Sequence, residues 1–392
     1  MAQTLEARRP FRSDCEAACE VRNLSRAEFR AAYALTVVFG ISSWVTVNGV
    51  FNILPAMISQ VPEGWSIAST IGLAVQAANV GPLAYRLGRR HVSIPAVIYT
   101  ILLVGSLSMF LLSCFWDRTW TIAGEPHSVA LVTLSFAAAI CDCTSSLVFW
   151  PYVGMLPPMM ISALALGENL SGLTSAAVSW LGFAPSATIT VLGFVPLLST
   201  AAFCGLQQLA ARASDGGTDM AVAPSSATLP STRGPALPYA VAGVMSVCEN
   251  AVMTSILPYA SARYSQQSYH VASTVPAAPL ALLTLAWAQA SRGLMMTLAV
   301  AAVGGMGLVV AVGLDVVDIG GTATILAITL TKVAIAYTKA VALYHVRTGA
   351  SSKVEMRHHL ENAGAVMQLW SMVGALVMFY IVHYTTMLPT RR

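Results

Sequence analysis

One stretch of the chain reads SWVTVNGVFNILPAMISQVPEGW, from Ser43 to Trp65, and it places polar and helix-weakening residues inside an otherwise apolar helix. These residues recur every three or four positions and so fall close to one stripe of a helix: Trp44, Asn48, Asn52 and Pro55. A polar stripe on a membrane-spanning helix must face protein or a water-filled space. We therefore expect this helix to face the interior of a helical membrane protein.

The composition of the whole chain agrees with this class. Hydrophobic residues make up 56% of the 392 residues and charged residues only 10%, whereas soluble domains carry about 25% charged residues. The mean hydropathy is +0.69. The net charge of +4 comes from arginines next to the apolar segments and needs no nucleic-acid partner.

Apolar segments long enough to cross a membrane repeat along the chain, and we count about eleven of them. We predict an all-α polytopic fold with spans at Arg30–Ser59, Ser66–Tyr85, Ser93–Phe115, His127–Met155, Met159–Phe183, Ala187–Leu209, Pro238–Tyr259, Ser268–Ala288, Gly293–Leu314, Gly321–His345 and Glu361–Met387.

A stretch rich in Ser, Thr, Gly and Pro divides the spans into six and five, as in transporters built from two helix bundles. The predicted parts are an N-terminal cytosolic tail (1–29), a first bundle (30–212), a cytosolic linker (213–237) and a second bundle (238–392). Asn48 with Leu54-Pro55 and Asn250 with Leu257-Pro258 open the two bundles in a similar way, which weakly supports an internal repeat.

Loop charge predicts the orientation. Most loop arginines and lysines fall on one side of the predicted membrane, and only four fall on the other: Arg118, Arg263, Arg391 and Arg392. By the positive-inside rule the N-terminus is cytosolic, and an odd number of spans places the C-terminus outside.

Charged residues within the spans are few and costly, so each needs a partner or a function. Asp142, Glu168 and Glu249 are candidates either for structural hydrogen bonds or for substrate and proton handling. Lys332 and Lys339 lie seven residues apart on one helix face, and we expect one of them to pair with an acid.

Several motifs resemble the riboflavin transporters of solute carrier family 52. The first stretch, S-W-V-T-x-N-G, is similar to the first helix of that family. Further similar motifs are Q-A-A-N-V-G-P (Gln76–Pro82), D-C-T-S-S (Asp142–Ser146), G-E-N-L-S-G-L (Gly167–Leu173), the pair Tyr269-His270, and Tyr337 with Lys339. The resemblance covers Ser43 to Lys339 and is stronger in the first six spans. One departure is Ile53, where the animal members carry an acid.

The resemblance implies a plasma-membrane carrier that imports riboflavin by alternating access. Riboflavin is uncharged, with a flat ring, an imide edge of one donor and two acceptors, and a polyhydroxy arm, so it needs aromatic faces and neutral hydrogen-bonding groups. Candidate substrate-binding residues are Trp44, Asn48, Asn52, Gln76, Asn79, Asp142, Thr144, Ser145, Glu168, Asn250 and Tyr337, and Phe149, Trp150 and Tyr152 are further stacking candidates. Candidates for proton coupling or ion pairing are Asp142, Glu168, Glu249 and Lys339.

Other functions remain open at this point. The sequence has no paired catalytic aspartates and no H-E-x-x-H motif, so we expect no enzyme, no metal site and no cofactor. The expected partners are riboflavin as substrate and membrane lipids, with no nucleic acid, and the oligomeric state is open. The alternatives are a carrier of another neutral ring-bearing solute, such as a nucleoside, and a receptor that does not transport.

Overall fold

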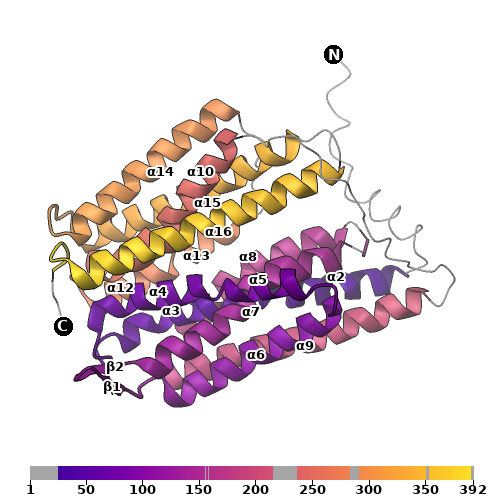
Figure 1. Cartoon of the computed structure of the whole chain (residues 1–392), viewed down its shortest axis with the longest axis horizontal. Coiled ribbons are helices and arrows are strands. Elements are labelled where there is room, and N and C mark those ends of the chain that lie inside the picture. The colour runs from indigo at the N-terminus through magenta and orange to yellow at the C-terminus, as the bar shows by residue number, and fades with distance from the viewer. Residues whose placement is uncertain are drawn as a thin grey trace.

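The computed structural model describes residues 25–154, 156–157, 159–214, 236–282, 291–349 and 353–389. Its helices form two bundles that lie side by side along the long axis (Figure 1). The elements of the first bundle are α2 (Arg26–Ile41), α3 (Val45–Met57), the 3₁₀ turn η1 (Gly64–Ser66), α4 (Ile67–Ala77), α5 (Val80–Gly88), α6 (Ile94–Phe115), β1 (Trp120–Ile122), β2 (Glu125–His127), α7 (Val129–Val153), α8 (Met159–Ser179) and α9 (Pro185–Ser214).

The second bundle follows after residue 235. Its elements are α10 (Ala236–Val247), the π-helical segment η2 (Cys248–Met253), α11 (Thr254–Ser261), α12 (Gln266–Thr274), α13 (Ala277–Leu282), α14 (Arg292–Gly313), α15 (Gly321–Thr348) and α16 (Lys353–Tyr384).

Eight helices in the described part of the chain are long and apolar enough to cross a membrane, and the bent pair of α2 and α3 makes a ninth. The remaining two predicted spans correspond to α8 and to the short helices α12 and α13. Residues 283–288 of the predicted eighth span lie outside the described residues. The predicted all-helical multispan class is therefore confirmed, and the number eleven stays a prediction.

The predicted first span is wrong in one respect, because it is not one continuous helix. α2 and α3 meet at an angle of 49° around the residues Ser42, Ser43 and Trp44. The Ser42 hydroxyl donates to the Phe39 carbonyl (2.8 Å), and the Ser43 amide donates to the Gly40 carbonyl (3.1 Å). These short-range bonds close the last turn of α2 and let the chain change direction before α3 begins.

Large apolar side chains are exposed on the outside of both bundles. Leu103, Leu107 and Leu111 on α6 are all exposed, at the four-residue spacing of one helix face. Leu369, Val373 and Val377 repeat this pattern on α16. An apolar face of this kind is stable against hydrocarbon.

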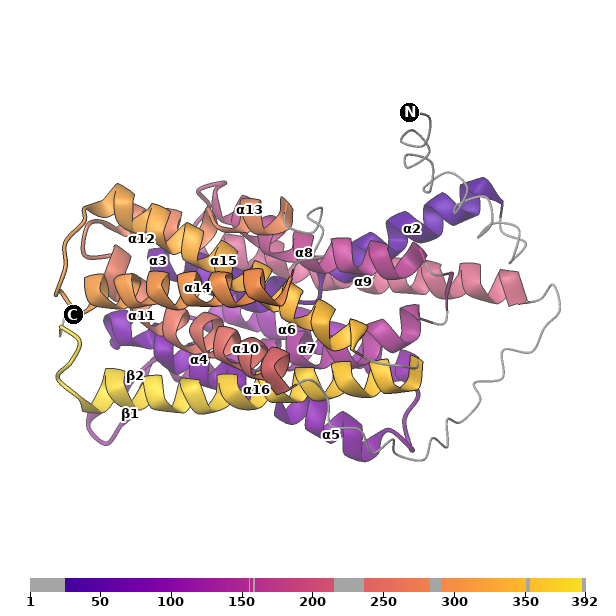
Figure 2. The ribbon, with the colours of Figure 1, turned by 90° about the horizontal axis from the view of Figure 1, so that it is seen from above.

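The ends of the first and last helices lie at opposite ends of the molecule. α2 begins at the right-hand end in Figure 2 and α16 ends at the left. A short antiparallel hairpin, β1–β2, lies at the left-hand end, where it joins α6 to α7 (Figure 1). Its two-residue turn has positive φ at Ala123 (53°) and Gly124 (91°), as tight hairpins require.

The two bundles are joined by contacts near this left-hand end. Gln266 of α12 donates to the Pro55 carbonyl of α3 (2.7 Å), and the Trp180 indole donates to Thr274 (2.9 Å). His383 of α16 lies within hydrogen-bonding distance of Thr70 on α4 (3.0 Å). Toward the right-hand end the ribbons of the two bundles diverge (Figure 1).

The connection between α14 and α15 is tied to the end of α11 by Arg263. Its guanidinium contacts Asp315 (2.6 Å) and donates to the Val312 carbonyl (2.9 Å). Tyr264 donates to Asp318 (2.6 Å), and this bond, followed by one from the Gly320 amide, lowers the pKa of the Asp318 carboxyl. The exposed connection therefore keeps a carboxylate that accepts these bonds at neutral pH.

Candidate functional site

Asp142 holds the start of α3. Its side chain is fully buried on α7, and one carboxylate oxygen accepts from the Thr46 hydroxyl (2.8 Å) while the other accepts from the Val47 amide (2.9 Å). Trp44, at the N-cap position of α3, makes no side-chain cap. A carboxylate at this position satisfies an N–H that has no partner within the helix and lies favourably in the helix dipole. Asp142 thus caps α3 from a neighbouring helix.

Two more predicted residues, Ser145 and Glu168, bond to Ser43 at the bend between α2 and α3. The Ser145 hydroxyl donates to the carbonyl of its own helix at Asp142 (2.7 Å) and lies 3.3 Å from the Ser43 carbonyl. Glu168 of α8 accepts from the Trp150 indole (3.0 Å) and from the Ser43 hydroxyl (3.4 Å). The structure therefore brings Asp142, Ser145 and Glu168 together around the bend of the first span.

α2 and α8 approach closely beside this bend. A Cβ placed on Gly167 would lie 2.3 Å from the Val37 carbonyl oxygen and 2.8 Å from the Gly40 Cα. A Cβ on Gly40 would lie 2.7 Å from the Leu164 carbonyl oxygen. These distances leave no room for a side chain, so the two glycines permit the backbone contact that positions Glu168 next to Ser43.

The polar stripe of α3 faces α8. Asn48 donates to Ser171 (3.3 Å) and Asn52 donates to Ser175 (2.9 Å). Both pairs have a four-residue spacing on their helices, so they form two successive rungs between α3 and α8. Neither serine was among the predicted substrate-binding residues, although Ser171 lies in the G-E-N-L-S-G-L motif.

A second polar group lies where the bundles meet. Asn79, between α4 and α5, donates to the Gln76 carbonyl (2.9 Å), to the Gln76 side-chain oxygen (3.4 Å) and to the Gln368 side-chain oxygen on α16 (3.1 Å). Gln368 was not among the predicted residues. The available signal was an amide in the otherwise apolar run of the last helix, Val366–Tyr380.

The second bundle repeats one of the first bundle's contacts. Asn250 lies in the π-helical segment η2 and donates to Ser371 of α16 (3.0 Å). Asn48 and Ser171 form the corresponding pair in the first bundle. The weak sequence echo around these two asparagines thus coincides with the same type of hydrogen bond in both bundles.

Glu249, next to Asn250, forms an ion pair with Lys339 of α15. The side chains keep 31% and 25% of their surface exposed, so the pair is partly solvated. π-Helical turns often occur at functional positions because they displace side chains from the regular helix pattern. Here η2 presents an acid and an amide on successive residues.

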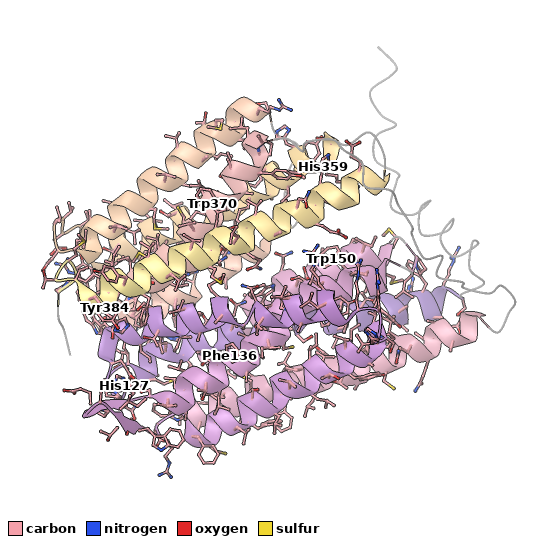
Figure 3. The ribbon with its side chains drawn as sticks, in the orientation of Figure 1. His127, Phe136, Trp150, His359, Trp370 and Tyr384 are labelled. Carbon is pink, nitrogen blue, oxygen red and sulfur yellow. The ribbon has the colours of Figure 1, made fainter. Side chains whose placement is uncertain are left out.

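The aromatic residues that we predicted to stack on the substrate differ in how accessible their rings are. The Phe149 ring packs against Phe39 with centroids 4.0 Å apart, and Tyr152 packs edge-on against Phe203 at 4.8 Å. Both rings lie in the core of the first bundle, so in this conformation they are not free to stack on a solute. In Figure 3, Trp150 lies in the right-hand half of the first bundle, whereas His127 and Tyr384 lie near the left-hand end of the molecule.

Most of the predicted residues therefore fall into four groups of contacts rather than one. One surrounds the bend between α2 and α3, one is the pair of bonds from Asn48 and Asn52 to α8, one joins Gln76 and Asn79 to Gln368, and one is the polar part of η2 with Lys339. Thr144 is buried against Gly81 of α5, and its hydroxyl has no hydrogen-bonding partner in the described part of the chain. Trp44 and Tyr337 are partly buried at the edge of the core. Within the described residues no group of three or more His, Cys, Asp or Glu side chains could hold a metal ion.

Comparison with known proteins covers both bundles. The family model described as "Solute carrier family 52, riboflavin transporter" matches residues 30–183 and 207–390. A protein of Danio rerio, "Solute carrier family 52, riboflavin transporter, member 3-B", is 40% identical over 151 residues, which are 38% of this chain and 33% of that protein. The Homo sapiens member 3 is 38% identical over 152 residues, 38% of this chain and 32% of that protein. These matches span about a third of the length of the curated relatives.

Solved structures with the same fold share little sequence. A D-xylose-proton symporter aligns over 90% of both chains with a TM-score of 0.59 and 12% identity. The nucleoside transporter NupG aligns over 92% of this chain and 93% of its own, with a TM-score of 0.55 and 12% identity. At this identity the similarity shows the fold and carries no information on substrate.

Proposed function

We propose that this chain, which belongs to the riboflavin transporters of solute carrier family 52, carries riboflavin across the plasma membrane by alternating access. The observation that carries the proposal is the family match, which extends through both bundles. The relatives that match in sequence are named as riboflavin transporters.

The chemistry of the polar groups supports a neutral substrate. Asn48, Asn52, Gln76 and Asn79 offer amides, and the hydrogen bonds of their side chains go to serines, to amide oxygens and to a backbone carbonyl. Lys339 is paired with Glu249, and Lys332 interacts electrostatically with the same carboxylate. An anionic solute would require unpaired Arg or Lys side chains, because an unpaired buried charge costs several kcal/mol.

The arrangement of contacts supports alternating access. Several hydrogen bonds between the bundles lie near one end, where α16 finishes, and the ribbons diverge toward the other end (Figure 1). With the N-terminus cytosolic and the C-terminus outside, this corresponds to a carrier closed to the exterior. Rocking of the bundles would break these contacts and close the opposite end.

The three acids differ in the roles that we assign to them. Both Asp142 oxygens accept bonds from α3, and Glu168 holds the preceding bend, so we assign both to positioning the first span. Glu249, with its partner Lys339, is the remaining candidate for proton coupling. We assign substrate contacts to the amide groups rather than to these carboxylates.

The direct test is uptake of radiolabelled riboflavin into liposomes that contain the purified protein, with and without a proton gradient. We expect saturable uptake that unlabelled riboflavin and lumiflavin inhibit, and much weaker inhibition by flavin mononucleotide in a phosphatase-free assay. Uridine serves as the competitor that represents a nucleoside carrier. Equal inhibition by uridine would contradict the riboflavin assignment, and binding without uptake would identify a receptor.

A further inference from the structure

The carboxamide group of Gln76, Asn79 and Gln368 joins the two bundles at a place away from the contacts near the end where α16 finishes. Gln76 and Asn79 belong to the first bundle, and Gln368 belongs to α16 of the second. Gln76 is 5% exposed, and the other two residues are partly buried. Asn79 contacts both glutamines at this interface between the bundles. Buried polar atoms normally have hydrogen-bonding partners, so the atoms of these three amides that lack one require an explanation.

The hydrogen bonds determine how each amide is oriented. The Gln76 backbone carbonyl can only accept, so the Asn79 atom 2.9 Å from it must be the nitrogen Nδ2. The same Nδ2 donates its second hydrogen to the Gln368 side-chain oxygen (3.1 Å), and this hydrogen or the first is shared with the Gln76 side-chain oxygen (3.4 Å). The remaining atoms are therefore Oδ1 of Asn79 and the two Nε2 groups of Gln76 and Gln368.

These remaining atoms have no partners among the residues that the structure describes. Asn79 Oδ1 is buried and accepts no hydrogen bond. Asn79 lies at the N-cap of α5, where an asparagine oxygen usually accepts a backbone N–H, yet it makes no such cap. Neither Nε2 group donates to a described residue. The group thus retains one acceptor and two N–H₂ donors.

This set is complementary to an imide, which presents one N–H between two carbonyl oxygens. We propose that Asn79 Oδ1 accepts the imide N–H of the flavin ring, while the Nε2 groups of Gln76 and Gln368 donate to its two carbonyl oxygens. The assignment rests on the proposed function, because it takes its ligand from there. It adds Gln368 as a specificity-determining residue and identifies which edge of the ring the group binds.

The position of Gln368 gives the contact a second consequence. One turn further along α16, Ser371 accepts from Asn250 and lies 3.3 Å from the Ser246 carbonyl, so this face of α16 is tied to η2 of its own bundle. In this structure the Asn79–Gln368 bond connects the bundles directly. When the imide is bound, it connects the same two residues through their remaining atoms as well. Because Asn79 Oδ1 is shielded in this conformation, the groups that cover it must move before the ligand can reach it.

The test compares riboflavin with 3-methylriboflavin, in which a methyl group replaces the imide hydrogen. For the wild-type protein in liposomes, we expect the methylated flavin to compete with labelled riboflavin about tenfold more weakly, the loss expected for one hydrogen bond in a binding site. If wild-type protein transports riboflavin and both flavins compete equally, the inference is wrong and the proposed function stands. If riboflavin is not transported at all, both are wrong.

Gln368→Glu tests the donor itself. The carboxylate retains the oxygen that accepts from Asn79 but removes the Nε2 donor, so we expect riboflavin to bind about tenfold more weakly, as for the loss of one hydrogen bond. 3-Methylriboflavin keeps both carbonyl oxygens, so its affinity should fall by the same factor and the ratio between the two ligands should stay at the wild-type value. Unchanged affinity for riboflavin in a variant present at the membrane would overturn the role of Gln368.

Gln266→Glu is the matched control. Gln266 also lies in the second bundle and also bonds to the first, but it donates to the Pro55 carbonyl of α3, away from the carboxamide group. Riboflavin affinity should therefore stay near the wild-type value in this variant. A loss as large as that of Gln368→Glu would show that a general loss of bundle contact, rather than the imide contact, produces the effect. If Gln368→Glu does not reach the membrane, the wild-type ratio decides.

Discussion

At the scale of single residues, Asp142 shows how a carboxylate is kept in the interior of a membrane protein. Its two oxygens accept from Thr46 and Val47, both in the first turn of α3. The helix start gains an acceptor that Trp44 does not supply, and the carboxylate gains donors that lipid does not supply. A buried acid of this type can serve structure without contacting the solute.

We expect Asp142→Ala to destabilise the protein. It leaves the Val47 amide and the Thr46 hydroxyl without their acceptor, and each buried donor left unsatisfied costs about 1–3 kcal/mol. Thr46→Val removes only one of these bonds and should cost less. The measurement is the thermal unfolding midpoint of the purified protein in detergent.

The companion variant Asp142→Asn separates this role from proton transfer. It keeps the side-chain size and one oxygen acceptor, so any pH dependence of riboflavin uptake should survive. Normal stability together with loss of the pH dependence would instead assign Asp142 to proton coupling.

At the scale of elements, irregular backbone within the spans coincides with polar residues. The bend before α3 contains Ser42 and Ser43, the junction of α4 and α5 contains Asn79, and η2 contains Glu249 and Asn250. Side chains of neighbouring helices bond to each of these places. Non-regular backbone in a membrane needs such partners, because lipid offers none. The bend before α3 also depends on the close packing of α2 against α8.

Gly167→Ala should disrupt that packing. The new Cβ would lie 2.3 Å from the Val37 carbonyl oxygen, an atom of the backbone that cannot rotate away. Overpacking of this kind costs about 1–3 kcal/mol or more, and it should also separate Glu168 from Ser43. Gly304→Ala is the control, since nothing lies within 4 Å of its Cβ position. If the two variants show equal thermal unfolding midpoints, the close approach is not required for stability.

At the scale of the whole molecule, side chains reach from one bundle to the other near the end where α16 finishes. Gln266 bonds to the α3 backbone, Trp180 bonds to Thr274, and Trp65 packs edge-on against Tyr259 with centroids 5.5 Å apart. His270 packs against Trp180 at a centroid distance of 5.0 Å. None of these contacts lies within a single bundle, so a rocking motion can break them without unfolding either half.

Loss of these bonds should favour the conformation open at this end. We expect the double variant Gln266→Leu, Trp180→Phe to lose two bonds of about 1 kcal/mol each, which shifts the equilibrium between conformations roughly tenfold or more. Spin labels at the exposed positions Ser59 and Gln267 would report longer distances.

Tyr99→Phe is the control for this measurement, because it removes a hydrogen bond to Gln207 within the first bundle. Its label distances should match those of the parent protein. An unchanged distance distribution in the double variant would show that these bonds do not control the closed end.

Much of this protein follows from sequence alone because a membrane imposes simple requirements. Long apolar segments such as Ile94–Phe115 have few stable alternatives to a spanning helix. Polar residues within such segments are costly, so Asn48, Asn79, Asp142 and Glu249 could be selected as important without a structure. Motifs in the first six spans were sufficient to indicate the family that the comparisons confirm.

The partners of these residues were decided only by tertiary structure. Asp142 and Val47 are far apart in sequence, and Asn79 and Gln368 belong to different bundles, so no local pattern relates them. The bend before α3 was missed because Ser42 and Ser43 are compatible with a helix. Only in the folded chain do Asp142 and Ser145 bond to the broken backbone and Glu168 to the Ser43 hydroxyl. Composition and periodicity determine which segments enter the membrane and which residues are costly there. Packing between helices determines which donor meets which acceptor, because hydrogen bonds depend on distances that only the folded chain sets.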